Sequence, residues 1–228
     1  MSLTYIHHSC FALVEDSFVI VYDYWIDPQN TLRTILNDAE SQGKWVYFIT
    51  SHFHADHYNP DIPTWCAEHE QWHYLPSYDT FRRRHIAKDL PLAVLRFGDV
   101  VETPHFRIHA YHSTDVGISS VTVLNNGTTL YHAGDNNNWY FPSSQLPDSA
   151  RVRITADQME KLYLSTLREI KADFPTLDHA MLPVDDRLGQ EMIRGLIQFL
   201  DTIQVRHPHP MHYCLVPTPD PTTTTSKQ

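Results

Sequence analysis

Residues 45–57 read WVYFITSHFHADH, an uninterrupted apolar run that ends in a dense group of polar side chains. The run over 45–50 is rich in aromatic and β-branched residues, which predicts a β-strand buried on both faces. His52 and His54 stand two positions apart, so an extended chain points both side chains the same way. Asp56 and His57 follow at a turn, which can direct them to an adjacent position.

This segment carries four side chains of the types that bind metal ions. Neutral imidazoles suit zinc, and carboxylates can bind zinc or orient its bound water. The alternative interpretation is a polar surface turn that happens to contain several histidines. Four ligand-type side chains at this spacing, directly after a buried strand, favour metal binding. The sequence therefore predicts a metal site formed by His52, His54, Asp56 and His57.

Strand-like and helix-like segments alternate on both sides of the motif. Short apolar runs bounded by polar or turn residues predict strands over 11–14, 18–22, 72–75, 92–95, 105–111, 118–124, 128–132 and 180–184. Apolar residues at helical spacing predict helices over 30–42, 155–171 and 190–203. The alternation favours an α/β layered architecture.

Length and composition fit a globular domain. The chain has 228 residues, of which 42% are apolar, enough to bury a large core. We expect a single domain over 1–216 and a disordered tail over 217–228, which are rich in proline and threonine. No stretch approaches the roughly 20 apolar residues that a membrane-spanning helix needs, and the first residues do not resemble a secretory signal.

The cysteine content indicates a cellular compartment, and the net charge indicates which partners are disfavoured. Three cysteines without a CxxC pair predict reduced thiols and a cytoplasmic location. The formal net charge of −10 disfavours binding along a nucleic-acid backbone.

The HxHxDH pattern after a strand resembles the signature of the metallo-β-lactamase superfamily, and the resemblance extends along most of the chain. His112 ends a predicted strand where the superfamily places its third metal histidine. Residues 132–135 (HAGD) and 210–213 (PMHY) resemble two later metal-binding elements of the superfamily. Residues 8–11 (HSCF) are similar to the start of the branch that includes ascorbate-6-phosphate lactonase. The resemblance implies a four-layer αββα sandwich.

The resemblance also implies two divalent metal ions, most simply Zn²⁺, with Mn²⁺ or iron as alternatives. One ion would bind His52, His54 and His112. The second would bind Asp56, His57 and His212, and Asp135 would bridge the two ions. Asp115 is the alternative to His112, while His207 and His209 are alternatives to His212.

The implied activity is that of a metal-dependent hydrolase acting on a small ester, a lactone or a phosphate-bearing molecule. A hydroxide between the two metals would attack the substrate, and Asp56 would orient it and accept its proton. The alternatives are a phosphodiesterase or nuclease of the same fold, and a redox or non-catalytic member that retains the metal site. We expect a small-molecule substrate and neither a nucleic-acid nor a membrane partner; the oligomeric state stays open.

Overall fold

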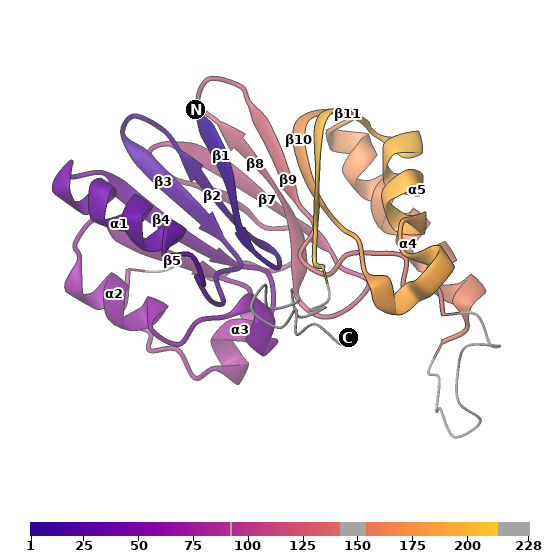
Figure 1. The fold of residues 1–228 in the computed structure, drawn as a ribbon, viewed down its shortest axis with the longest axis horizontal. Helices are drawn as coiled ribbons and strands as arrows, with labels where there is room; N and C mark the ends of the chain where they lie inside the picture. The colour runs from indigo at the N-terminus through magenta and orange to yellow at the C-terminus, as the bar shows by residue number, and fades with distance from the viewer. Residues whose placement is uncertain (92, 142–153, 214–228) are drawn as a thin grey trace, which may run out of the picture.

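The computed structural model describes residues 1–91, 93–141 and 154–213, which form two β-sheets with helices on their outer faces (Figure 1). The first sheet has the order β1 (Ser2–His7), β2 (Cys10–Val14), β3 (Phe18–Tyr22), β4 (Trp45–Thr50) and β5 (Trp72–Pro76). The second sheet has the order β11 (Gln204–Met211), β10 (Thr176–Pro183), β9 (Thr129–His132), β8 (Ile118–Leu124), β7 (Phe106–His112) and β6 (Val100–Glu102).

The helices complete a four-layer arrangement. On the side of the first sheet lie α1 (Thr31–Ser41), α2 (Ile62–Glu68) and α3 (Tyr78–Arg83), whereas α4 (Ala156–Asp173) and α5 (Arg194–Thr202) cover the second sheet (Figure 1). Two short 3₁₀ helices, η1 (Ala55–His57) and η3 (Asp186–Glu191), follow β4 and β10. The αββα sandwich expected from the sequence is therefore confirmed.

Two apolar clusters hold the layers together. One cluster joins the facing sheets and continues to α4 and α5; the other joins the first sheet to α1 and α2. In β4, Tyr47 and Ile49 belong to the first cluster, and Val46 and Phe48 belong to the second. The strand is thus buried on both faces, as its unbroken apolar run predicts.

Strand direction brings several loops to one edge of the sandwich. β3, β4 and β5 are parallel, and so are β9, β10 and β11. The chain leaves β4 at Ser51, whose carbonyl accepts a hydrogen bond from Ile118 N at the start of β8. His212 N, just after β11, donates to His8 O between β1 and β2. The ends of strands from both sheets are therefore tied together at this edge.

Most of the predicted elements are present, but two of them differ, and five elements of the structure, β1, β6, β11, α2 and α3, were not predicted. The expected strand over 92–95 is not formed by its described residues, because Leu95 makes only an isolated bridge to Ser77. The helix expected to begin at 190 begins at Arg194, after a kink at Gly189 with φ 58°. β1 has no simple apolar alternation, because its one buried residue, Ile6, follows the exposed Tyr5 and three of its residues are half-buried.

Some expectations are not tested. The tail over 217–228 lies outside the described residues, and the domain boundary at 216 and the cytoplasmic location stay predictions. No helix among the described residues is long and apolar enough to cross a membrane.

The sandwich core yields a stability prediction. Leu130 on β9 is fully buried in the cluster between the layers, whereas Leu162 on α4 is 43% exposed. Leu130→Ala should lower the free energy of unfolding by about 2–5 kcal/mol, because it removes buried methyl groups and leaves a cavity. Leu162→Ala, the control, should change it by less than about 0.5 kcal/mol. Urea denaturation measures both, and equal losses would contradict the layer assignment.

Candidate metal centre

Three imidazoles converge on one carboxylate at the edge where the strand ends meet. His52 and His57 follow β4, His212 follows β11, and Asp135 follows β9. The Nε2 atoms of His57 and His212 each lie 3.1 Å from Asp135 Oδ1, and His52 Nε2 lies 3.5 Å from Asp135 Oδ2. Side chains about 160 positions apart in the chain, such as His52 and His212, thus share one centre.

Buried carboxylates orient two of these rings from behind. His57 Nδ1 lies 2.7 Å from Asp23 Oδ2, and His212 Nδ1 lies 3.3 Å from Asp185 Oδ2. When His57 Nδ1 carries the proton and donates to Asp23, the Nε2 lone pair faces Asp135, whereas the contact of His212 with Asp185 lacks the geometry of a hydrogen bond. Histidine ligands of metals are typically held in this way.

His52 is oriented through a hydroxyl group. Ser51 Oγ lies 2.9 Å from His52 Nδ1 and donates to Asp23 Oδ2 at 2.6 Å. Ser51 N also donates to Asp23 Oδ1 at 2.7 Å. Asp23 therefore orients His52 and His57 together.

Burial and opposite charges set the ionisation of the centre. Burial would raise the pKa of Asp135, but the neighbouring histidines, with His57 first, hold it well below its usual range. Burial works to lower the pKa of His57, yet its carboxylate neighbours raise it well above the ordinary value. Similar neighbours raise the pKa of His212 to about 9 against burial, whereas burial lowers that of His52 to about 3. Metal-free, the centre favours positive charge, which a divalent cation can supply in place of protons.

Unpaired atoms support the same interpretation. His57 Nε2, His212 Nε2 and Asp135 Oδ1 are buried and make no hydrogen bond of acceptable geometry, although each Nε2 lies 3.1 Å from Asp135 Oδ1. Leaving buried polar atoms unpaired is costly. A cation bound among them would compensate each of these atoms, so the donor set fits a metal ion.

The candidate ligands divide into two subsites. His52, His54, Asp115 and Asp135 offer ligand atoms that all lie within 4.8 Å of one another, and this group is called the outer subsite. His8, Asp56, His57 and His212 meet the same criterion and are called the inner subsite. Asp23, His52 and His57 form a third such group, but both Asp23 oxygens already accept hydrogen bonds.

The structure places Asp115, and not His112, beside the outer subsite. Asp115 Oδ2 lies 3.5 Å from His54 Nδ1. The ring of His112 stacks on Phe97 and contacts Glu169 of α4, with Nδ1 2.9 Å from the carboxylate. His112 therefore lies outside the cluster, and the alternative ligand Asp115 lies inside it.

The loop that carries Asp115 is hydrogen-bonded to the loop that carries Asp135. Thr114 Oγ1 lies 2.6 Å from Asn137 O and 2.9 Å from Asn137 N, and Thr114 N donates to Asn136 Oδ1. These groups are buried, so the two carboxylates are held in a defined relation.

The other late histidines lie away from the centre. His209 Nε2 lies 3.0 Å from His179 Nδ1, and His207 stacks on His179 across β10 and β11. Of the three histidines in residues 207–212, only His212 reaches the centre.

Sequence reasoning did not place four residues that build the centre among the ligands or their supports: His8, Asp23, Ser51 and Asp185. A usable signal existed for two of them. Asp23 follows β3 directly and Asp185 lies two residues beyond the end of β10, at the edge where the carboxyl ends of parallel strands meet.

Comparison with known proteins gives matches in structure only. No protein-family model and no curated protein sequence matches this chain. Igni18, a metallo hydrolase from the archaeon Ignicoccus hospitalis, superposes with a TM-score of 0.63 at 19% identity, over 93% of this chain and 82% of its own. YhfI from Bacillus subtilis, a metallo-β-lactamase fold protein, gives 0.59 at 10% identity over 91% and 79% of the chains.

CmlA from Streptomyces venezuelae, a diiron β-hydroxylase, gives a TM-score of 0.58 at 8% identity. The match covers 92% of this chain but 44% of CmlA. At such identities these likenesses concern the fold.

Two glycines test how tightly the loops are packed. Gly117 has φ +74°, and an added Cβ would lie 2.1 Å from Ser51 O and 2.5 Å from His52 Cβ. Gly127 has φ +90°, but its Cβ would meet nothing within 4 Å. Both Ala variants carry backbone strain, so Gly117→Ala should lose additional stability and metal affinity by displacing His52. Thermal unfolding and metal titration of the two variants measure the difference; equal behaviour would show that the contact at Ser51 is unimportant.

Proposed function

We propose that this chain, which has the metallo-β-lactamase fold, is a metal-dependent hydrolase that binds two divalent cations. The observation that carries the proposal is the convergence of three imidazole Nε2 atoms on Asp135, each ring being held from behind by a carboxylate or by Ser51. Such preorganised donors are typical of metal sites.

The proposed ligand set follows the two subsites. His52, His54 and Asp115 hold the outer cation, and Asp56, His57 and His212 hold the inner one. Asp135 lies beside both groups, within 3.5 Å of His52, His57 and His212, and bridges them. Asp115 replaces His112 in this proposal because only Asp115 contacts His54.

The nitrogen and oxygen donors of each subsite indicate which metal ions it would bind. Zinc accepts nitrogen and oxygen donors and is the first choice for the inner subsite with its histidines. The outer subsite has two carboxylates and two imidazoles, and an oxygen-rich set also suits manganese or iron.

The chemistry would be hydrolysis by an activated water. Bound divalent cations would lower the pKa of water and stabilise negative charge that develops on the substrate. Asp56, whose side chain is 41% exposed, would orient the attacking water and accept its proton at a carboxylate oxygen. The buried Asp23 cannot serve as this base, because both of its oxygens accept hydrogen bonds within the protein.

The proposed substrate is a small ester, lactone or phosphate-bearing molecule. His54, Asp56 and Asp115 are the partly exposed members of the centre and mark the side from which a substrate would approach. The net charge of −10 favours a small substrate over a nucleic acid, although a small phosphodiester remains an alternative substrate. The resemblance of residues 8–11 to the lactonase branch makes lactones the first compounds to test.

A second candidate function is redox chemistry at two iron ions. The oxygen-rich outer subsite favours it, and CmlA, which shares the fold, is a diiron β-hydroxylase. Hydrolytic turnover by the metal-loaded protein separates the two functions, because iron alone would fit either of them.

Elemental analysis of protein purified without a metal-affinity column tests the ligand set. The wild-type chain should contain about two equivalents of transition metal, and Asp115→Ala about one. His112→Ala is the matched control and should retain both, because its ring contacts α4 instead of the centre. A chain that takes up neither zinc, manganese nor iron would refute the proposed function. Metal loss in His112→Ala, with none in Asp115→Ala, would restore the ligand set implied by resemblance.

Turnover of lactones and phosphodiesters tests the base. Asp56→Asn keeps the size of the side chain but removes its ability to accept a proton, so kcat should fall by about 10²–10⁴-fold. Asp16→Asn, at the exposed turn between β2 and β3, should have no effect. Rates are compared per equivalent of bound metal, and unchanged turnover in Asp56→Asn would exclude Asp56 as the base.

A further inference from the structure

We propose that His8 is a further protein ligand of the inner cation, beside Asp56, His57, His212 and the bridging Asp135. This inference rests on the proposed function and extends it. It assigns a metal-binding role to a residue in the turn between β1 and β2, far in sequence from every other ligand.

The backbone at His8 is held in a conformation that is unusual for its residue type. Its φ is 52°, in the left-handed region that side chains other than Gly, Asn and Asp seldom adopt. Among the described residues, five other than glycine have positive φ, and three of them, His8, Asp23 and His212, belong to the centre or its support. Strain that is concentrated at one place points to a functional requirement there.

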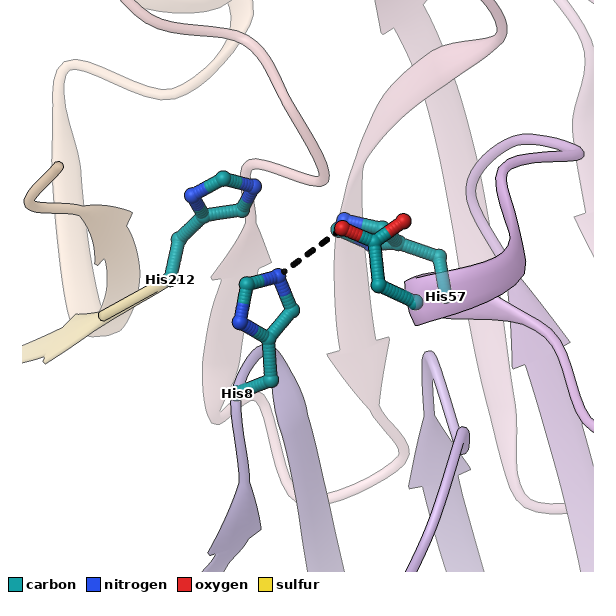
Figure 2. A group of neighbouring side chains, drawn as sticks. His8, His57 and His212 are labelled. Atoms are coloured by element: carbon teal, nitrogen blue, oxygen red, sulfur yellow. Dashed lines mark ion pairs between the residues drawn. The ribbon is translucent and has the colours of Figure 1, made fainter. Parts of the chain in front are cut away.

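His8 and His212 support each other directly. His212 N donates to His8 O at 2.9 Å, and the two rings lie 4.3 Å apart between centroids. Figure 2 shows the rings of His8 and His212 rising from different strand ends toward His57. The turn between β1 and β2 is thus fixed against the end of β11, with both rings turned to the same point.

The ring of His8 presents a free nitrogen to the inner subsite. His8 is 4% exposed, and its Nδ1 lies 3.3 Å from Tyr213 O. A carbonyl accepts only, so this contact assigns a proton to Nδ1, and in the neutral ring Nε2 then carries the lone pair. His8 Nε2 has no hydrogen-bond partner and lies 3.4 Å from Asp56 Oδ2.

A lone pair that faces a carboxylate oxygen at this distance is repulsive unless positive charge lies between them. A cation shared by His8 and Asp56 removes the repulsion and also satisfies the unpaired Nε2 atoms of His57 and His212. The ligand atoms of all four side chains lie within 4.8 Å of one another.

The assignment of His8 implies different roles for the two cations, one held mainly by buried ligands and the other more open to substrate. The inner subsite has three buried histidines and one partly exposed carboxylate, Asp56, whereas the outer subsite has two partly exposed ligands, His54 and Asp115. A closed site holds its ion tightly, and an open site leaves positions for water and substrate. The inner cation is therefore the tightly bound one, and the outer cation is the one that substrate reaches.

The competing explanation is an ion pair between a protonated His8 and Asp56. The two explanations differ in what the imidazole does to metal affinity. Removing a ligand weakens binding of the inner cation, whereas removing a competing positive charge leaves it unchanged or strengthens it.

The test uses variants that tolerate the left-handed backbone. His8→Asn and His8→Gly both fit positive φ and both lack the imidazole. His7→Asn is the matched control, since His7 is adjacent but its ring packs on Trp25 outside the inner subsite. Metal-free full-length proteins are titrated with Zn²⁺ in competition with a chromophoric chelator, and with Co²⁺ while its visible spectrum reports the coordination. Thermal unfolding checks that each variant is folded.

In both His8 variants we expect the inner cation to bind more than about 100-fold more weakly, beyond the roughly 10–100-fold effect of losing an outer-shell partner. The Co²⁺ spectrum of that site should also change, while His7→Asn matches the wild type. Two binding steps with affinity and spectrum unchanged in both variants would overturn the assignment of His8 and leave the proposed function intact. A wild-type chain that binds no metal would overturn both.

Discussion

The centre depends on one buried carboxylate. Asp23 is 1% exposed and accepts hydrogen bonds from Ser51 N, Ser51 Oγ and His57 Nδ1 at 2.6–2.7 Å. Burial would raise its pKa, but the charges of His57 and His132 lower it, so the group is ionised. An ionised carboxylate survives burial only when donors surround it, and these donors include the group that aligns His52. The hydrogen bonds that satisfy the buried carboxylate of Asp23 therefore also orient the rings of His52 and His57.

The loops around the centre are positioned by close packing and buried polar contacts. Gly117 and Gly134 lie so near Ser51 that a Cβ on either would come within 3.0 Å of it. Thr114 links the loop of Asp115 to that of Asp135, and Trp139 donates from Nε1 to Asp135 O at 3.0 Å. A metal centre assembled from separate loops needs such support, because small displacements of a ligand weaken binding strongly.

The two subsites suit different tasks for a physical reason. The inner subsite is rich in buried nitrogen donors, which favours tight retention of a cation. The outer subsite has two carboxylates and faces solvent through His54 and Asp115, which leaves access for water and substrate. Hydrolysis at a pair of cations needs both properties, a firmly held charge and an open position beside it.

The sequence by itself predicted the sandwich, and it proposed the ligand candidates His52, His54, Asp56 and His57 that the structure brings together. A buried strand followed by HxHxDH is a local pattern, since strand alternation and burial are set by neighbours along the chain. Only the tertiary structure decided that Asp115 joins the cluster while His112 turns to Glu169, because a contact 23 positions away, between Thr114 and Asn137, sets that loop. His8 entered the cluster for the same reason: its place is set by Tyr213, 205 positions along the chain, and no local pattern encodes contacts at that separation.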